Sequence, residues 1–327
     1  MNRTLLFQAG DAIGLGHLLA SIALYKHLAD RLGWRFCCSI RHNVLAVDPT
    51  QDVDPFFETF FALGEDRSCF SSEVFDQSLE QARDNGRAVM VACRSDRLDL
   101  VPGQHDVLAG MDFQVCLLPE FRDLLSQGQL PEADVVYIDT LCPFLPFPGV
   151  EAYYAGVPAF PPRLRAGDAD RATGPFIGIH VRHGNGEALS GRPMGGTERF
   201  NTLMAHYADR IEALRREHQI QDVLVLSDNS AVADSLARAV GGRAAADTPL
   251  PEVPFQTYLG APHASKLGRL ARTLADFDRL SEASVIGGAS SLFPLASWVW
   301  SDGASLAWID DWEEGRNVSP LGERPPV

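Results

Sequence analysis

The stretch from Phe176 to Glu187 (FIGIHVRHGNGE) constrains the fold of this chain more than any other. Its first half predicts a β-strand, because isoleucine and valine alternate with Gly178 and His180, and successive side chains of a strand point to opposite faces. The same alternation places His180 and Arg182 on one face, about 7 Å apart. The strand then ends at a Gly-Asn-Gly turn, where glycine permits backbone conformations that other residues avoid.

Two interpretations of Arg182 follow from this pattern. An arginine at the end of a buried strand, beside a glycine turn, is well placed to bind phosphate through its planar guanidinium. In the alternative, Arg182 forms an internal ion pair and the Asn-Gly pair is only a hairpin turn. The pattern leaves both open.

Each half of the chain predicts strands that alternate with helices. In the first half we expect strands at 4–7, 34–40, 88–92, 113–117 and 135–138, and helices at 18–31, 74–85 and 119–125. In the second half we expect strands at 176–182, 223–226, 283–286 and 306–309, and helices at 197–218, 231–240, 267–281 and 292–300. This alternation is typical of parallel sheets with helices on both faces.

The chain length and a proline-rich stretch divide these elements into two domains. A chain of 327 residues is about twice the usual domain size. Prolines and glycines gather between 143 and 162, and a polar segment follows at 167–173. We therefore predict an α/β protein with two Rossmann-like doubly wound domains, an amino-terminal one at 1–165 and a carboxy-terminal one at 166–327 whose tail packs back.

Charge and cysteine content exclude several classes of function. A net charge of −15 argues against binding to nucleic acid or anionic lipid. The longest apolar run, at 291–300, is too short to span a bilayer. The six cysteines have no zinc-like spacing, and the first residues do not read as a secretory signal. We expect reduced thiols and a cytoplasmic protein.

Polar residues follow three predicted strands of the second half. The carboxyl ends of parallel strands meet at one edge of a sheet, so these residues are candidates for a single ligand site. They are Arg182, His183, Asn185 and Glu187 after the first strand, Asp228 after the second, and Ser290 and Ser291 after the third. The two serines precede a helix, whose N-terminus favours an anion. Each of these serines, like Asp228, could instead be only a helix cap, but their recurrence favours a nucleotide phosphate site.

The glycine turn at residues 10–16 lacks the features of two common nucleotide motifs. It has no Gly-Lys-Ser/Thr ending, so it is not the phosphate loop of ATPases. It supplies Gly14-x-Gly16 of a dinucleotide fingerprint, but the bulky Leu19 occupies the third small position. We predict no metal site, because His180 and His183 fall on opposite faces of a strand and the scattered acidic pairs suit a solvated surface.

The sequence resembles a known family at this point. Residues 178–187 (GIHVRHGNGE) look like the first motif of the α1,6-fucosyltransferases, most of all the NodZ-like bacterial nodulation fucosyltransferases. Gly14-Leu-Gly16 and the helix after it are similar to that family's opening turn. Residues 226–229 and 287–291 stand where its second and third motifs would fall. The likeness covers residues 3–35 and 175–300, and the stretch between them is unmatched.

The resemblance implies a GT-B-like fold, with two domains facing across a cleft, and GDP-fucose as the donor. It also implies that the domain at 1–165 is on the acceptor side and that the domain at 166–327 binds the nucleotide sugar. It also implies inversion at the sugar carbon and no required metal or cofactor. Carried over by position, Arg182 holds the β-phosphate. The other residues that would line the donor site are His183, Asn185, Asp228, Ser290, Ser291, His180, Gly14, Gly16 and His17. An arginine and helix N–H groups could neutralise the charge that builds on departing GDP.

Inversion also needs a base for the acceptor hydroxyl. Glu187 is our candidate, with Glu198 and Asp11 as alternatives. The expected acceptor is an oligosaccharide, with α1,6 transfer to N-acetylglucosamine of a chitin-like chain implied by the resemblance. The alternatives are a transferase for another GDP-sugar, a Rossmann-type NAD(P) oxidoreductase, and a non-catalytic sugar-binding protein. The sequence does not fix the oligomeric state.

Overall fold

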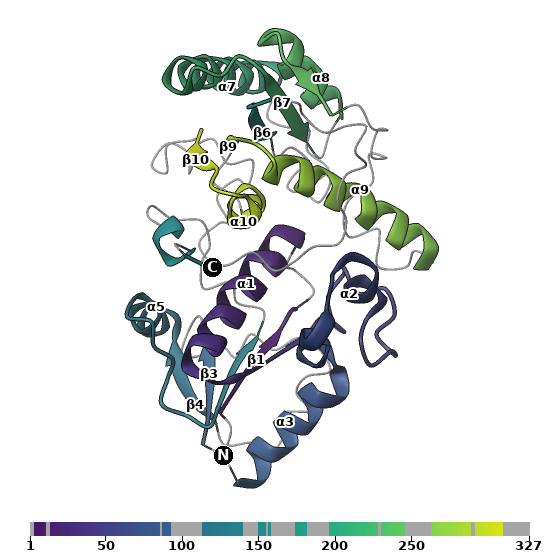
Figure 1. Cartoon of the computed structure of the whole chain (residues 1–327), viewed down its shortest axis with the longest axis vertical. Coiled ribbons are helices and arrows are strands. Elements are labelled where there is room, and N and C mark those ends of the chain that lie inside the picture. Colours follow the sequence, from purple (N-terminus) through teal and green to yellow (C-terminus); the bar gives the residue numbers. More distant parts are fainter. Residues whose placement is uncertain are drawn as a thin grey trace. The chain divides into compact units, whose positions relative to one another are not determined.

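The computed structural model describes residues 3–10, 14–85, 87–92, 113–139, 150–154, 156–157, 174–181, 196–227, 230–245, 263–288 and 292–309. The chain forms two compact units, and each contains a five-stranded parallel sheet with helices (Figure 1). The first unit holds the described residues up to 157 and the first turns of helix α9 (His263–Ser281), as far as Leu270. The predicted α/β class with two Rossmann-like doubly wound domains is confirmed.

The first unit is built on the sheet β2-β1-β5-β3-β4. Its strands are β1 (Thr4–Gln8), β2 (Arg35–Ser39), β3 (Ala88–Ala92), β4 (Phe113–Leu117) and β5 (Val135–Asp139). Its other elements are α1 (Leu15–Leu32), α2 (Pro55–Phe60), α3 (Ser72–Asn85), α5 (Leu118–Ser126) and the 3-10 helices η1 (Gly64–Phe70) and η2 (Val150–Tyr154).

Helices cover both faces of this first sheet (Figure 1). On one face Leu6 of β1 joins an apolar cluster with Phe75 and Leu79 of α3. On the other face the ring of Phe7 lies 5.3 Å from that of Tyr25 in α1. Both faces of β1 are therefore buried, as expected for a central strand of a parallel sheet.

Helix α2 was not predicted from the sequence. It begins after Asp54, whose carboxylate accepts a hydrogen bond of 2.8 Å from the backbone N–H of Phe56 and so caps the helix. Asp54 also accepts a hydrogen bond from the N–H of Val47, 3.0 Å away. The phenylalanines of α2 pack on one another and on Phe70. Burial of these rings, more than helical periodicity, holds the segment in place.

The second unit is built on the sheet β10-β9-β6-β7-β8. Its strands are β6 (Ile177–Val181), β7 (Val223–Ser227), β8 (Arg243–Ala244), β9 (Val285–Gly288) and β10 (Ser305–Trp308). Its helices are α7 (Gly196–His218), α8 (Ser230–Ala239), most of α9, and α10 (Leu292–Trp300). Among the described residues, no helix combines the length and the apolar character needed to cross a membrane.

The strand at the centre of our sequence predictions, β6, is also central in this sheet. Ile177, Ile179 and Val181 face a cluster formed with α7 and α8. Helices α9 and α10 lie on the other face (Figure 1). There Phe176, just before β6, belongs to an apolar cluster with Leu280 of α9. The predicted alternation is confirmed, and both of its faces are buried.

Strand β9 lies two residues later than predicted. Gly287 and Gly288 were interpreted as a turn, but they continue the strand and pair with Ile179 and His180. A Cβ atom on Gly287 would lie 2.8 Å from the Cδ1 atom of Ile179. Glycine is required here by close contact with β6, and not by a turn.

Gly178 on β6 gives a direct test of how tightly the second unit packs. A Cβ atom at this position would lie 2.8 Å from Leu280 Cδ1 and 2.9 Å from Ala283 Cβ. We expect Gly178→Ala to lower the free energy of unfolding by about 1–3 kcal/mol, because overpacking displaces these neighbours. Urea denaturation measures the change.

Gly268→Ala is the matched control. This exposed position inside α9 has no atom near the added Cβ, so we expect a gain of about 0.5–1 kcal/mol from helix propensity. Equal stability changes in the two variants would contradict the close contact of β6 with α9.

Candidate functional site

The order of strands in the second sheet reverses between β6 and β9. From β6 the chain adds β7 and β8 on one side, and it then returns to place β9 and β10 on the other. In doubly wound sheets, ligands bind beyond the carboxyl ends of the strands at such a switch point. The edge formed by His180 of β6 and Gly288 of β9, which are paired in register, is therefore the candidate site.

The predicted loops all start at this edge. Val181, the last residue of β6, pairs with Ser227, the last residue of β7, while β9 ends beside His180. The three strand ends are neighbours, so the loops that follow them leave from adjacent points. Seven predicted site residues in these loops lie outside the described residues: Arg182, His183, Asn185, Glu187, Asp228, Ser290 and Ser291.

His180 is described, and it links β6 to α10. Its side chain is buried, and its ring stacks on that of Phe293, with centroids 4.5 Å apart and planes at 28°. Phe293 meets Phe277 of α9 edge-on, at 5.6 Å. The aromatic contacts fix the first turn of α10 against the end of β6.

Gly288 makes this junction possible. A Cβ atom there would lie 2.8 Å from both the carbonyl oxygen of His180 and the Cγ atom of Pro294. The end of β9 is thus wedged between β6 and the start of α10. Strands β6 and β9, which lead into the predicted loops that begin at 182 and 289, are therefore held in register at their ends.

The electrostatics of this edge favour an anion. Helices α8 and α10 both begin just beyond strand ends, and neither has an acidic residue in its first turn. Within the first turns of α8 and α10 no carboxylate opposes the positive end of the helix dipole, and Asp228 comes just before α8 in the sequence. Two helix N-termini at one edge can bind phosphate, which is the ligand that the sequence predicts there.

The first sheet has its own switch point, between β1 and β5. The chain adds β2 on one side of β1 and places β5, β3 and β4 on the other. Helix α1 follows β1, and its first turn brings together the predicted residues Gly14, Gly16 and His17. Gly14 is extended (φ −84°) and caps the helix without a side-chain hydrogen bond, and a Cβ atom there would meet nothing. Leu19, at the third position of the dinucleotide pattern, is buried in the core.

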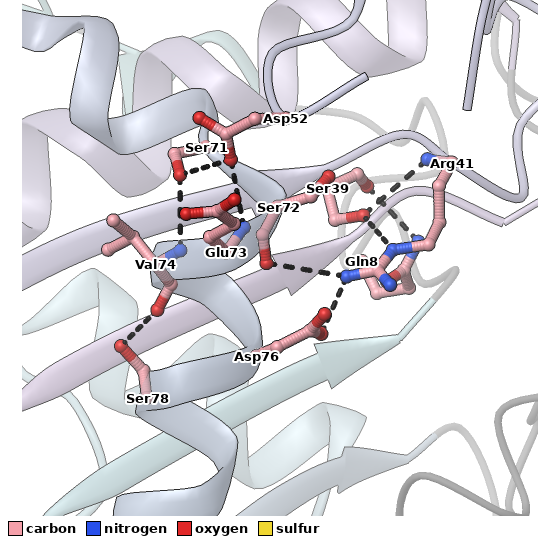
Figure 2. Close-up of polar contacts among 10 residues, drawn as sticks. All are labelled: Gln8, Ser39, Arg41, Asp52, Ser71, Ser72, Glu73, Val74, Asp76 and Ser78. Atoms are coloured by element: carbon pink, nitrogen blue, oxygen red, sulfur yellow. Dashed lines mark hydrogen bonds and ion pairs between the residues drawn. The ribbon is translucent and has the colours of Figure 1, made fainter. Parts of the chain in front are cut away.

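A polar cluster that sequence analysis missed lies at the end of β2 (Figure 2). The guanidinium of Arg41 donates through Nη2 to Asp76 Oδ1 at 2.6 Å and through Nε to Ser39 Oγ at 3.3 Å. The amide of Gln8 donates to the carbonyl oxygen of Ser39 at 3.2 Å. The signal in the sequence was a glutamine at the end of a buried strand, whose partners are visible only once strand register is known.

The same view shows how α3 begins (Figure 2). Ser71 Oγ accepts a hydrogen bond from Val74 N–H at 3.1 Å and donates one to Asp52 at 2.6 Å. Burial acts to raise the pKa of Asp52, but hydrogen bonds from Ser71 and from the N–H of Glu73 outweigh it, and the pKa is lowered. This capping network positions Asp76, one turn further along α3.

His42 follows Arg41 in the chain. Burial, together with the nearby charge of Arg41, lowers the pKa of its imidazole. At neutral pH this histidine is therefore uncharged, and the cation of the cluster is Arg41.

The described side chains offer little support for metal or thiol chemistry. Across the described ranges, no group of three histidine, cysteine, aspartate or glutamate side chains could hold a metal ion. Burial raises the pKa of Cys37 to about 11 and those of Cys69 and Cys116 to about 12. These thiols stay protonated at neutral pH and are poor nucleophiles.

Comparison with solved structures identifies the fold. The fucosyltransferase NodZ from Bradyrhizobium aligns with a TM-score of 0.52 and 16% identity, over 92% of this chain and 93% of that one. This chain shares the fold of NodZ. The fold is therefore GT-B-like in its two Rossmann-like domains.

Two further solved structures align less closely. POFUT1 in complex with GDP aligns with a TM-score of 0.41 and 13% identity, over 94% of this chain and 98% of that one. Arabidopsis thaliana FUT1 aligns with a TM-score of 0.43 and 15% identity, over 94% of this chain and 70% of that one. No protein-family model matches the chain, and no curated protein matches its sequence.

The raised thiol pKa values predict slow alkylation. At pH 8, a thiol with a pKa of about 11, such as that of Cys37, is far less ionised than a free cysteine with a pKa near 8.5. We expect iodoacetamide to label Cys37 about 100-fold more slowly in the native protein than in urea, as followed by peptide mass spectrometry. The native rate should rise with pH up to about 11. Rapid native labelling at pH 8 would contradict the burial of this thiol.

Proposed function

We propose that the protein is a glycosyltransferase that moves fucose from GDP-fucose to a hydroxyl of an oligosaccharide, with inversion at the sugar carbon and without a metal or cofactor. The observation that carries this proposal is the meeting of three loop-bearing strand ends at the switch point of the second sheet. The fold shared with a fucosyltransferase over more than nine-tenths of both chains supports it. So does the sequence resemblance of the loops themselves.

Arg182 follows β6 directly and is proposed to bind the β-phosphate of GDP. A bidentate guanidinium stabilises the diphosphate as negative charge develops on it during departure. His183, Asn185, Asp228, Ser290 and Ser291 would complete the nucleotide site with His180, because their loops leave from adjacent strands. Gly14, Gly16 and His17 would meet the pyrophosphate through the first turn of α1, whose N-terminus lacks a side-chain cap.

The donor sugar and the acceptor are less constrained than the nucleotide. Fucose and an N-acetylglucosamine acceptor come from the resemblance, and another GDP-sugar is the nearest alternative. A nicotinamide enzyme is disfavoured, because Leu19 fills the position where a dinucleotide-binding helix needs a small residue. Transfer from a panel of GDP-sugars in the presence of EDTA distinguishes a transferase from a non-catalytic sugar-binding protein, which would release no GDP.

Replacement of Arg182 tests the phosphate site. We expect Arg182→Ala to raise the dissociation constant of GDP about 100-fold, measured by calorimetry with EDTA present, because a charge-assisted bidentate contact is lost. Arg87→Ala is the control, since Arg87 is exposed at the amino end of β3, 3.9 Å from Glu132. Unchanged GDP binding by Arg182→Ala would show that Arg182 does not bind the nucleotide.

Replacement of Glu187 tests the proposed base. We expect Glu187→Gln to lower kcat for transfer by about 100-fold or more while GDP affinity is kept, because the acceptor hydroxyl loses its proton acceptor. The fall in wild-type kcat at acidic pH, caused by protonation of the base, should disappear in the variant. Glu198→Gln and Asp11→Asn are the comparison variants. If one of them abolishes transfer while Glu187→Gln is fully active, the role passes to that residue.

A further inference from the structure

The carboxyl edge of the first sheet carries a buried polar row. Gln8 ends β1 and Ser39 ends β2, and the two residues are paired in register. Each is only 2% exposed. One pleat below them on the same face, Leu6 and Cys37 belong to an apolar cluster. The core thus changes from apolar to polar within two residues along the strands, and Asp139 holds the register position beside Gln8 on β5.

Gln8 has a hydrogen-bond acceptor that the described part of the chain does not use. Its Nε2 donates to the carbonyl oxygens of Ser39, at 3.2 Å, and Ala9, at 3.5 Å. Its amide oxygen accepts no hydrogen bond from any described residue. This oxygen is not among the buried polar atoms that lack a partner, so it is reached by solvent and can accept a hydrogen bond from a ligand.

Arg41 supplies a donor beside it. Ser39 contacts both residues, since its backbone carbonyl accepts from Gln8 and its hydroxyl accepts from Arg41 Nε. Arg41 Nη2 is held by Asp76 at 2.6 Å and by the carbonyl oxygen of Ser72 at 3.5 Å (Figure 2). Within the described residues Nη1 has no acceptor, and the side chain is 24% exposed. The guanidinium is therefore held in place with one donor nitrogen left for a ligand.

The charges of this cluster favour a neutral ligand. Asp76 neutralises Arg41 at 2.6 Å, and the free oxygen of Gln8 would repel an anion. A hydroxyl group can donate to the amide oxygen and accept from Nη1 at once. A narrow hollow beside Ser39 and Arg41 is also lined by Gln51 and Ser72, among others, while Gln8 lies outside its lining.

We propose that Gln8, Ser39 and Arg41 form a carbohydrate subsite that binds a hydroxyl of a neutral oligosaccharide. The cluster stands at the end of β1, beside the switch point of its sheet, where doubly wound domains bind ligands. The assignment of this oligosaccharide as the acceptor rests on the proposed function. The binding of a neutral sugar by these three residues does not.

The test compares Gln8→Met with Thr4→Val in the full chain. Methionine keeps the length of the side chain and removes the amide oxygen. Thr4 is a buried polar residue at the opposite end of the same strand, 6% exposed, so Thr4→Val is a matched loss of polarity away from the edge. Arg41→Lys is a second variant, which keeps the charge opposite Asp76 and removes Nη1.

Binding of a panel of neutral oligosaccharides, including N,N′,N″-triacetylchitotriose, is measured by calorimetry and saturation-transfer NMR. We expect the tightest wild-type ligand to bind at least 10-fold more weakly to Gln8→Met and Arg41→Lys and equally well to Thr4→Val, with GDP affinity unchanged in all three. Wild-type affinity in both edge variants, or no oligosaccharide binding by the wild type, overturns the subsite. If GDP fails to bind but the oligosaccharide result holds, the proposed function fails and this inference stands.

Discussion

The parallel pairing of β6 with β7 on one side and β9 on the other is the constraint on which the second unit depends. Both faces of β6 are buried, so a shift of one residue in its register would exchange the core-facing sets of side chains. The register fixes which residues end the three strands, and hence where the loops begin. The apolar residues Ile177 and Ile179 thus fix the end of β6 at Val181, directly before Arg182 in the sequence.

Three glycines strengthen the pairing of β6 with its neighbours, although glycine in a sequence usually indicates a flexible backbone or a turn. At Gly178, Gly287 and Gly288, an added Cβ atom would lie within 3 Å of a neighbouring atom, and none of the three has a positive φ. Their role is to let β6, β9, α9 and α10 approach closely. The junction below the predicted phosphate site is therefore tightly packed, which suits a site that must hold a developing charge in fixed geometry.

Sequence patterns predicted most of the fold because its elements have regular periods and clear ends. The strands Ala88–Ala92 and Phe113–Leu117 and the helix Leu292–Trp300 have the predicted bounds. Helix α2 was missed because it has only six residues, too few for the apolar face formed by Phe56, Phe57 and Phe60 to stand out as helical periodicity. The end of β9 was missed because paired glycines are typical of turns. In the candidate site, sequence identified the residues that follow strands, whereas the Gln8–Ser39–Arg41 cluster depends on register between distant segments and on the position of α3.

The two carboxyl edges differ in the charged residues around them, and this difference suits the two ligands that we propose. Beyond the second sheet, α8 and α10 have no acidic residue in their first turns, and the sequence adds Arg182 directly after β6, with Glu187 and Asp228 in the loops of the same edge. Beyond the first sheet, Arg41 is already neutralised by Asp76 and lies beside an amide oxygen. A diphosphate gains most from an arginine and helix N-termini, while a hydroxyl gains most where a donor and an acceptor are both fixed and the charges around them cancel. A transferase needs both kinds of edge, because its donor is anionic and its acceptor is neutral.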